Sequence, residues 1–350
     1  MKTEYINIEH NNPETIKPAI ERAGKILREG GLVAFPTETV YGLGANGLDA
    51  AAVSKIFQAK GRPSDNPLIL HIADRDDLSA LVREIPNWLV PLLDRFWPGP
   101  LTVVLPRTAC VPDIVTAGLD TVAVRLPSSP VARALIRTAG VPVAAPSANL
   151  SGRPSPTAAS AVMADMAGRI EMVLDGGVCE VGLESTVLDC TAEIPTILRP
   201  GGVTQEMLAA CLGKVRTSGD ERMETAAVPR APGMKYRHYA PVAPLRLFSC
   251  DAIEGEAGLL QQLRAAQRSG QKVGAVVSPE TAMLLPNDVE IAIHGSRKSP
   301  AAAAAGLYQA LRWFDTHPVD VIFAEGMPEQ GIGRALMNRL HKAAGSAGEE

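Results

Sequence analysis

Two cations stand one residue apart in the string KGRPSDNPL, which covers residues 60–68. Lys60 supplies a compact charge, and Arg62 supplies a planar fork that can grip phosphate oxygens through two hydrogen bonds. The glycine and two prolines of the string predict a stiff loop that holds both cations. The string therefore indicates a phosphate-binding loop. The alternative is that both cations only complement the negative end of a helix, an effect worth about 0.3–1 kcal/mol each.

A second candidate is the string PTETVYGLG at residues 36–44, directly after a predicted strand. Its hydroxyl groups can hydrogen-bond a small ligand, and its glycines let the backbone approach that ligand closely. A glycine-rich turn that only reverses the chain is the alternative.

A third candidate is the string SANLSGRPSPT at residues 147–157, after another predicted strand. Its hydroxyl groups and amide form a neutral hydrogen-bonding surface, which suits a nucleotide or an anion at the start of the following helix. Thr157 would also serve as the N-cap of that helix. One loop can have both roles.

Three further polar residues stand in apolar strand segments. Arg125 and Arg199 each end a predicted strand, and an arginine buried without a partner is costly. Each must therefore meet an anionic ligand or, as the alternative, an acidic side chain. His71 is either a ligand contact or a satisfied core histidine.

These candidates need a scaffold that brings strand ends and loops together. Short β-branched runs alternate with helical patterns from Ile16 to about Gly213, which predicts an α/β domain. Some predicted strands follow each other without a helix, so we expect a mixed sheet. The predicted strands are Leu32–Phe35, Leu68–Ile72, Leu101–Leu105, Thr121–Arg125, Val141–Ala145, Met172–Leu174, Ser185–Asp189 and Thr196–Leu198. The predicted helices are Ile16–Glu29, Ala50–Ala59, Leu78–Phe96, Val131–Thr138 and Ala158–Ala167, with Pro130 in a first turn and Gly140 as a C-terminal cap.

A second domain is predicted after a linker. Apolar periodicity fades over residues 214–244, where prolines stand among charged residues. We therefore place one domain at 1–213 and another at 245–350. In the second, strands at Leu245–Phe248, Val273–Val277, Val289–Ile293 and Val319–Ala324 alternate with helices at Leu259–Arg268, Ala301–Asp315 and Arg334–Ala344. That order predicts a small Rossmann-like, doubly wound domain.

The composition disfavours several classes of protein. A net charge of -4 and an aromatic share of 4% argue against a broad nucleic-acid surface, so any phosphate partner must be bound locally. The five cysteines include no Cys-x-x-Cys pair, which argues against a zinc site and fits a reducing compartment. The segment Met1–Pro13 is polar, and no apolar run approaches the roughly 20 residues of a membrane helix. We expect a cytoplasmic protein without a membrane segment.

Taken in order, the strings PTETVYGLG, KGRPSDNPL, SANLSGRPSPT, ESTVLD and LRPG resemble the YrdC-type threonylcarbamoyl-AMP synthase family. The linker string APGMKYRHYAP and the C-terminal string GIGRALMNRLHKAA resemble its two-domain members, so the resemblance covers nearly the whole chain. It implies a YrdC-like twisted mixed sheet with helices, followed by the Rossmann-like domain. It also implies a nucleotidyltransferase that converts L-threonine, bicarbonate and ATP into threonylcarbamoyl-AMP and pyrophosphate for transfer RNA modification.

The resemblance also assigns residues to each substrate. The residues implied for L-threonine are Thr39, His71, Arg125, the backbone around Ala145, and Ser185. The residues implied for ATP are Lys60, Arg62, Asn66, Thr121, Ser147, Ser155, Arg199 and, closing over the nucleotide, Tyr236. Lys60 and Arg62 are the expected catalytic cations, and no protein-held metal is expected.

The implied reaction needs no enzyme nucleophile. The threonine amine takes up carbon dioxide or bicarbonate to form a carbamate, whose oxygen attacks the α-phosphorus of ATP and expels pyrophosphate. Catalysis then consists of aligning two anions and neutralising charge, with Mg²⁺ bridging phosphate oxygens. Carbamates decompose in water, so the linker segment 234–239 is expected to act as a lid.

Two other functions are weighed against this one. A double-stranded RNA or tRNA-binding module without catalysis would use the same arginines, but the acidic balance disfavours it. A dinucleotide oxidoreductase is suggested by Gly331-Ile332-Gly333, which lacks the third glycine of that fingerprint. The expected partners are the three substrates and a transferase complex that takes the product, with weak RNA binding left open.

Overall fold

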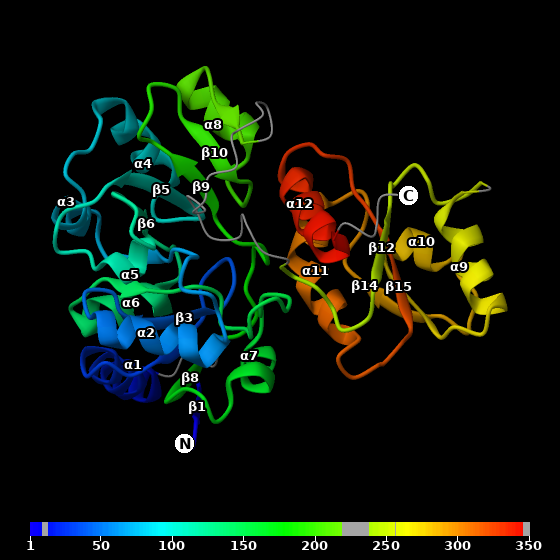
Figure 1. The fold of residues 1–350 in the computed structure, drawn as a ribbon, viewed down its shortest axis with the longest axis horizontal. Coiled ribbons are helices and arrows are strands. Elements are labelled where there is room, and N and C mark those ends of the chain that lie inside the picture. Colours follow the sequence, from blue (N-terminus) through cyan, green and yellow to red (C-terminus); the bar gives the residue numbers. More distant parts are fainter. Residues whose placement is uncertain (9–12, 219–237, 256, 346–350) are drawn as a thin grey trace. The chain divides into compact units, whose positions relative to one another are not determined.

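The computed structural model describes residues 1–8, 13–218, 238–255 and 257–345. The chain divides into two compact units (Figure 1). The first comprises 1–151, 156–180 and 184–235, and the second comprises 152–155, 181–183 and 236–350. Two short segments from within the first predicted domain therefore group with the second unit.

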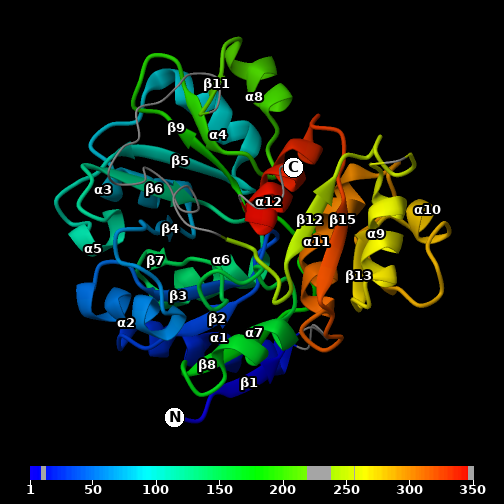
Figure 2. The same ribbon diagram turned by 45° about the vertical axis from the view of Figure 1, so that its right-hand side comes forward.

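In the first unit, the described strands form an 11-stranded mixed sheet (Figure 2). Parallel and antiparallel pairs alternate irregularly across it, which confirms the predicted mixed sheet. In sheet order the strands are β1 (Glu4–Asn7), β8 (Met172–Asp175), β2 (Val33–Phe35), β3 (Gly42–Asn46), β7 (Val143–Ala144), β4 (Ile69–His71), β6 (Thr121–Arg125), β5 (Leu101–Pro106), β9 (Thr186–Asp189), β10 (Thr196–Arg199) and β11 (Arg216–Thr217). Because β11 pairs with β10, the sheet continues past the predicted domain end at Gly213.

Helices cover the two faces of this sheet with separate apolar clusters. The helices of the first unit are α1 (Pro13–Arg28), α2 (Ala50–Lys60), α3 (Leu78–Leu81), α4 (Val90–Phe96), α5 (Asp113–Thr116), α6 (Pro130–Ala139), α7 (Ala159–Met166) and α8 (Gln205–Leu212), with short 3₁₀ turns at Arg75–Asp77 and Asn87–Leu89. Helices α1 and α6 pack on β2, β7 and β8. Helices α2, α4 and α7 pack on the opposite face. Alternate residues of each strand serve the two clusters, as the period of two in a β-strand requires.

Local capping fixes the helix ends that matter for the site. The side chain of Asp49 accepts hydrogen bonds from the first turn of α2, and Gly61 ends that helix in the left-handed conformation, with φ of 61°. Lys60 therefore closes the helix and Arg62 opens the loop. Helix α6 begins with Pro130 and ends before Gly140, as predicted.

Three local predictions are wrong. The stretch Leu78–Phe96 is not one helix: α3 stops at Val82, which is extended and pairs with Arg107, and α4 starts only at Val90. Residues 42–46, expected as part of a glycine-rich loop, form β3. The N-cap position of α7 is Ala158, so Thr157 does not cap it.

The second unit contains a four-stranded, all-parallel sheet, which confirms the predicted Rossmann-like domain. In sheet order its strands are β12 (Leu245–Phe248), β15 (Val321–Glu325), β13 (Val273–Val277) and β14 (Glu290–Ile293). Its helices are α9 (Leu259–Arg268), α10 (Pro279–Ala282), α11 (Pro300–Trp313) and α12 (Ile332–Ala344). Helix α9 packs on one face of the sheet, while α11 and α12 pack together on the other (Figure 1). Over the part of the chain that the structure covers, no helix is long and apolar enough to cross a membrane.

Candidate functional site

Polar side chains line up across five neighbouring strands of the first unit, β4, β6, β5, β9 and β10. His71 lies opposite Arg125, and Arg125 lies opposite Thr102. Thr102 and Arg199 lie opposite the same residue of β9. In-register neighbours on adjacent strands point to the same face of a sheet. His71, Arg125, Thr102 and Arg199 therefore form one row, which we call the site row.

Arg125 is the best-connected member of the site row. Its Nη1 donates a hydrogen bond to Thr39 Oγ1 at 2.9 Å, and its Nε donates to the Gly99 carbonyl oxygen at 3.3 Å. Its Nη2 lies 2.7 Å from Glu38 Oε1, and both side chains of this ion pair are less than 10% exposed. Burial alone raises the pKa of Glu38, but the Arg125 charge and its hydrogen bond outweigh that effect and lower the pKa below the ordinary value. Glu38 is therefore a buried carboxylate anion.

His71 stands beside Arg125 as a neutral ring. Burial lowers the pKa of His71 to about 3, and the positive charge of Arg125 adds to the effect. Its ring meets Phe35 edge to face. Nδ1 is buried and has no hydrogen-bond partner among the described residues. Backbone groups of Ile69 and Val143 also act on the ring, so the alternative of a core histidine stays open beside that of a ligand contact.

Ser185 joins the other end of the site row. Ser185 Oγ lies 2.7 Å from Thr102 Oγ1. Arg199 donates from Nη2 to the carbonyl oxygen and Oγ of Ser185, at 3.0 and 3.3 Å. Ser185 and Thr102 are fully buried, and Arg199 is 6% exposed. The polar row is thus buried, and its groups are held in place by one another.

Lys60 connects two of the predicted loops. Its Nζ donates to the carbonyl oxygens of Ser147 and Asn149, at 2.5 and 2.6 Å. Ser147 Oγ donates to Asn149 Oδ1 at 2.5 Å. Because Lys60 is 2% exposed, it complements these buried carbonyl groups and fixes the loop at 147–149 against the end of α2.

Arg62, Asn66 and Thr121 lie at the opposite end of the parallel strands β4 and β6. Arg62 donates to the carbonyl oxygens of Asn66 and Pro67, which holds the loop in a closed shape. Asn66 is buried, and its Oδ1 has no hydrogen-bond partner within the described ranges. Thr121 shares a face of β6 with Arg125 and lies about 13 Å from it, at roughly 3.3 Å per residue.

Three predicted residues remain, namely Ala145, Ser155 and Tyr236. The amide of Ala145 donates to the Ile69 carbonyl oxygen at 3.0 Å, which fixes the backbone next to β4. Ser155 is buried but belongs to the segment that groups with the second unit. Tyr236 lies outside the described residues. The structure therefore gathers Thr39, His71, Arg125, Ser185 and Arg199 along the site row, and Lys60 with Ser147 at the neighbouring loops.

Two residues of the site were not singled out from the sequence. Glu38 stands inside the string PTETVYGLG, and its position next to Thr39 was the available signal. Thr102 is the lone hydroxyl group in the apolar strand Leu101–Pro106. Nothing in the sequence links Thr102 to Ser185, 83 positions later, because only sheet register brings them together.

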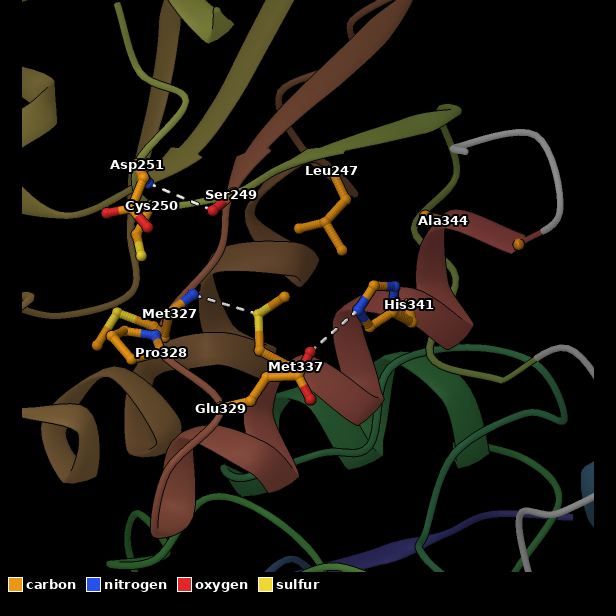
Figure 3. Close-up of a pocket in the computed structure, with 11 residues that line it drawn as sticks. Leu247, Ser249, Cys250, Asp251, Met327, Pro328, Glu329, Met337, His341 and Ala344 are labelled. Atoms are coloured by element: carbon orange, nitrogen blue, oxygen red, sulfur yellow. Dashed lines mark hydrogen bonds and ion pairs between the residues drawn. The ribbon is translucent and has the colours of Figure 1, made fainter. Parts of the chain in front are cut away.

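A cavity of about 480 Å³ lies in the second unit, beside the ends of β12 and β15 and along α12 (Figure 3). Met327, Met337 and Leu247 contribute apolar walls, and Asp251 and Glu329 contribute carboxylates. Its described lining residues include no lysine or arginine, so this cavity is poorly suited to a triphosphate.

The cysteine and acidic side chains of the described residues are the candidates for thiol and metal sites. Cys179 and Cys190 are buried, and burial raises the pKa of Cys179 to about 12, so its thiol is protonated at neutral pH. Among the described residues, no group of three or more histidine, cysteine or acidic side chains could hold a metal ion.

Comparison with known families agrees with the division into two parts. The profile of the Sua5, YciO and YrdC family, described as telomere recombination, matches residues 25–201. The profile described as the threonylcarbamoyl-AMP synthase C-terminal domain matches residues 203–345. The chain belongs to the Sua5/YrdC family. It has the two-domain form of that family, because both profiles match in order along one chain.

Individual relatives of the Sua5/YrdC family cover nearly the whole chain. The threonylcarbamoyl-AMP synthase of Bacillus subtilis is 50% identical over 336 residues, which are 95% of this chain and 94% of the relative. The protein of that name from Pyrococcus abyssi is 46% identical, over 93% of this chain and 94% of its own. The crystal structure of Pyrococcus abyssi Sua5 with L-threonine has a TM-score of 0.90 and 45% identity, and covers 98% of each chain. The relatives are named as synthases rather than as RNA-binding modules.

Proposed function

We propose that this protein is an L-threonylcarbamoyladenylate synthase, which joins L-threonine, bicarbonate and ATP and releases pyrophosphate. The observation that carries the proposal is the buried site row, in which Arg125, Thr39 and His71 meet at one end and Ser185 and Arg199 at the other. A fixed guanidinium beside hydroxyl groups and a neutral imidazole suits an amino acid that has a carboxylate and a side-chain hydroxyl.

Each substrate is assigned its own set of residues. Thr39, His71, Arg125, Ser185 and the backbone at Ala145 are proposed to bind L-threonine, with Arg125 on its carboxylate. The residues proposed for ATP are Lys60, Arg62, Asn66, Thr121, Ser147, Ser155, Arg199 and Tyr236.

The proposed reaction has two steps, and this chain contributes alignment and charge. The threonine nitrogen, as the free amine, attacks the carbon of bicarbonate with loss of water, or that of carbon dioxide with loss of a proton, and a carbamate forms. A carbamate oxygen then attacks the α-phosphorus of ATP, the bond from that phosphorus to the bridging oxygen breaks, and pyrophosphate leaves. Arg62 and Arg199 neutralise the phosphate charge that grows as pyrophosphate departs. Lys60 holds the loop that carries Ser147, and so it sets the distance between the two substrates.

Magnesium is proposed to arrive with ATP as part of the substrate. The residues proposed for the phosphates are cations and neutral hydroxyl or amide groups, which suit phosphate oxygens rather than a divalent cation. The ion would then take its ligands from phosphate and water. Its chemistry is to bridge phosphate oxygens and withdraw charge from them.

The product would serve a second protein. A mixed anhydride of a carbamate and a phosphate is short-lived in water, so a transferase complex that modifies transfer RNA is the proposed acceptor, in the cytoplasm.

One assay tests this proposal. Purified full-length protein is incubated with ATP, magnesium and bicarbonate, and pyrophosphate release is measured with each of the amino acids in turn. We expect release that depends on both L-threonine and bicarbonate. Release without an amino acid, or equal release with serine, valine and threonine, would contradict the proposal.

A further inference from the structure

Glu38 is a buried carboxylate that pairs with Arg125 of the site row. Its side chain is 8% exposed, and Arg125 Nη2 lies 2.7 Å from Oε1. Arg125 and the backbone amides of Glu38 and Ser128 hydrogen-bond this carboxylate and lower its pKa. A carboxylate offers about four acceptor positions. Glu38 therefore has acceptor capacity left for a ligand that carries donors.

The charges around Arg125 do not balance if threonine contributes only its carboxylate. This argument rests on the proposed function, in which that carboxylate binds Arg125. One buried guanidinium would then face two carboxylates, from Glu38 and from the substrate. An uncompensated buried charge is strongly unfavourable. The site needs a second cation when the substrate is bound.

A free amino acid supplies that cation itself. Its α-ammonium group is attached to the same carbon as its carboxylate, so both charges arrive together. With the ammonium on Glu38 and the carboxylate on Arg125, positive and negative charges alternate around the site. The neighbouring His71 is neutral and adds no charge to this arrangement.

We infer that Glu38 binds the α-ammonium group of the amino acid, so that Arg125 and Glu38 together recognise its zwitterionic head group. Glu38 is thus a specificity-determining residue for a free amino acid over a hydroxy acid of the same shape. Thr39, next in sequence, hydrogen-bonds Arg125, which keeps the pair in one orientation.

The same contact helps to direct the carbamate. The ammonium group first gives one proton to solvent, because only the free amine has a lone pair, and the amine and bicarbonate then give the carbamate and one water molecule. The ammonium thereby leaves Glu38, and the new carbamate oxygens are anionic. Like charges repel strongly where they are buried. Repulsion from Glu38 therefore favours an orientation in which these oxygens point away from Glu38 and towards the nucleotide.

The test compares two ligands that differ in the amine. L-Threonine and 3-hydroxybutyrate share the carboxylate and the hydroxyl group, but only threonine has the ammonium. Calorimetry on the full chain measures both dissociation constants for wild type and for Glu38→Gln. We expect Glu38→Gln to weaken threonine about 10- to 100-fold. We expect 3-hydroxybutyrate to bind as well as before or better, because Arg125 no longer has a competing carboxylate. The preference for threonine should therefore collapse.

The outcomes separate three explanations. An unchanged preference, with both ligands weakened equally, would show that Glu38 only supports Arg125 and would overturn the inference. Glu184, the carboxylate next to Ser185, is the comparison. The inference would also be overturned if Glu184→Gln lost the preference for threonine over 3-hydroxybutyrate while Glu38→Gln kept it. If wild type binds no threonine, the proposed function itself is wrong. Circular dichroism and thermal unfolding of Glu38→Gln, together with partial recovery in Glu38→Asp, establish that the variant is folded.

Discussion

Single residues in this protein carry charges that the fold has removed from water. Arg125 and Arg199 are both nearly fully buried, yet each is held by groups that accept its hydrogen bonds. Arg125 pairs with an acidic side chain, Glu38, which is one of the two partners expected for a buried arginine. An ion pair of this kind is a weak source of stability, because desolvation offsets the attraction between the charges. Its position in the site row favours a role in binding instead.

Arg62 gives a prediction about catalysis. We expect Arg62→Ala to reduce threonine-dependent pyrophosphate release by at least about 10²–10³-fold, because a positioned donor to the phosphates is lost. The melting temperature should change little, since Arg62 is partly exposed and its hydrogen bonds to Asn66 and Pro67 lie within its own loop. Time courses of pyrophosphate release measure the turnover rate. Arg83→Ala, which removes a surface ion pair with Asp120, is the control and should keep full activity. Wild-type turnover in Arg62→Ala would contradict the assignment.

His71 gives a prediction about pH. Its pKa is about 3 in the folded protein and about 6.5 in the unfolded chain. The unfolded state therefore binds a proton below pH 6.5 that the folded state does not bind. This lowers the free energy of unfolding by up to about 1.4 kcal/mol for each pH unit between these values. Stability contributed by neutral His71 is present above pH 6.5 and is lost as the pH falls.

Chemical denaturation at pH 7 and pH 5 tests this linkage. His71→Gln should lose stability at pH 7, but it should show a shallower decline towards pH 5 than wild type. The half-exposed His341→Gln serves as the control and should keep the wild-type slope. Equal slopes in wild type and His71→Gln would refute the account of a buried neutral ring.

Elements of structure decide how the site residues meet. The strand order β4, β6, β5, β9, β10 places residues from positions 71 to 199 in one row, although the chain visits these strands in a different sequence. Register then selects which side chains face each other. A shift of one residue in any of these strands would move its polar group to the opposite face. The site is therefore a property of strand pairing as much as of residue type.

Gly201 gives a prediction at this scale. A Cβ at position 201 would lie 2.3 Å from the Thr186 amide nitrogen and 2.4 Å from the Glu184 carbonyl oxygen. Because these are backbone atoms, Gly201→Ala must displace the start of β9, directly after Ser185. We expect a loss of about 1–3 kcal/mol in stability together with a raised KM for threonine. Urea unfolding and steady-state kinetics measure the two effects.

Gly118→Ala separates crowding from backbone strain. Gly118 has a φ of 80° and no atom within 4 Å of an added Cβ, so its replacement adds only conformational strain. It should cost less stability than Gly201→Ala and leave the KM unchanged. An equal KM in wild type and Gly201→Ala would show that the backbone at Ser185 does not respond to this glycine.

At the scale of the whole molecule, the proposed ATP site and the proposed lid use different stretches of chain. The cationic residues of the proposed ATP site lie in the first unit. The described residues that line the cavity of the second unit include no lysine or arginine. The segment proposed as a lid, 234–239, begins in the stretch that the structure leaves undescribed.

Truncation tests the proposed lid. A chain ending at Ser218 keeps β11 and its pairing with β10. We expect it to fold, because both apolar clusters of the first unit's sheet lie before that point. We also expect it to lose adenylate formation, because Tyr236 is removed. Circular dichroism checks the fold, and pyrophosphate release checks activity. A truncated chain as fast as the full chain would contradict a closing role for the linker.

The sequence by itself determined the kinds of structure and the candidate chemistry. Strand and helix positions followed from hydrophobic periodicity, because one buried face imposes a period of two or 3.6. The break of the predicted helix at Val82 did not follow from it, because that residue leaves the helix to pair with Arg107. Strand β3 did not follow from it either, because its glycines favour a turn. Pairing with β2 on one side and β7 on the other keeps these residues extended.

Only the tertiary structure decided which polar groups meet. The loop strings already contained Lys60, Arg62 and Thr39, since local sequence sets loop chemistry. The ion pair of Glu38 with Arg125 and the contact of Thr102 with Ser185 join residues more than 80 positions apart. Such pairs depend on strand order and register across the sheet, which are set by the packing of the whole unit. No local pattern of residues contains that information.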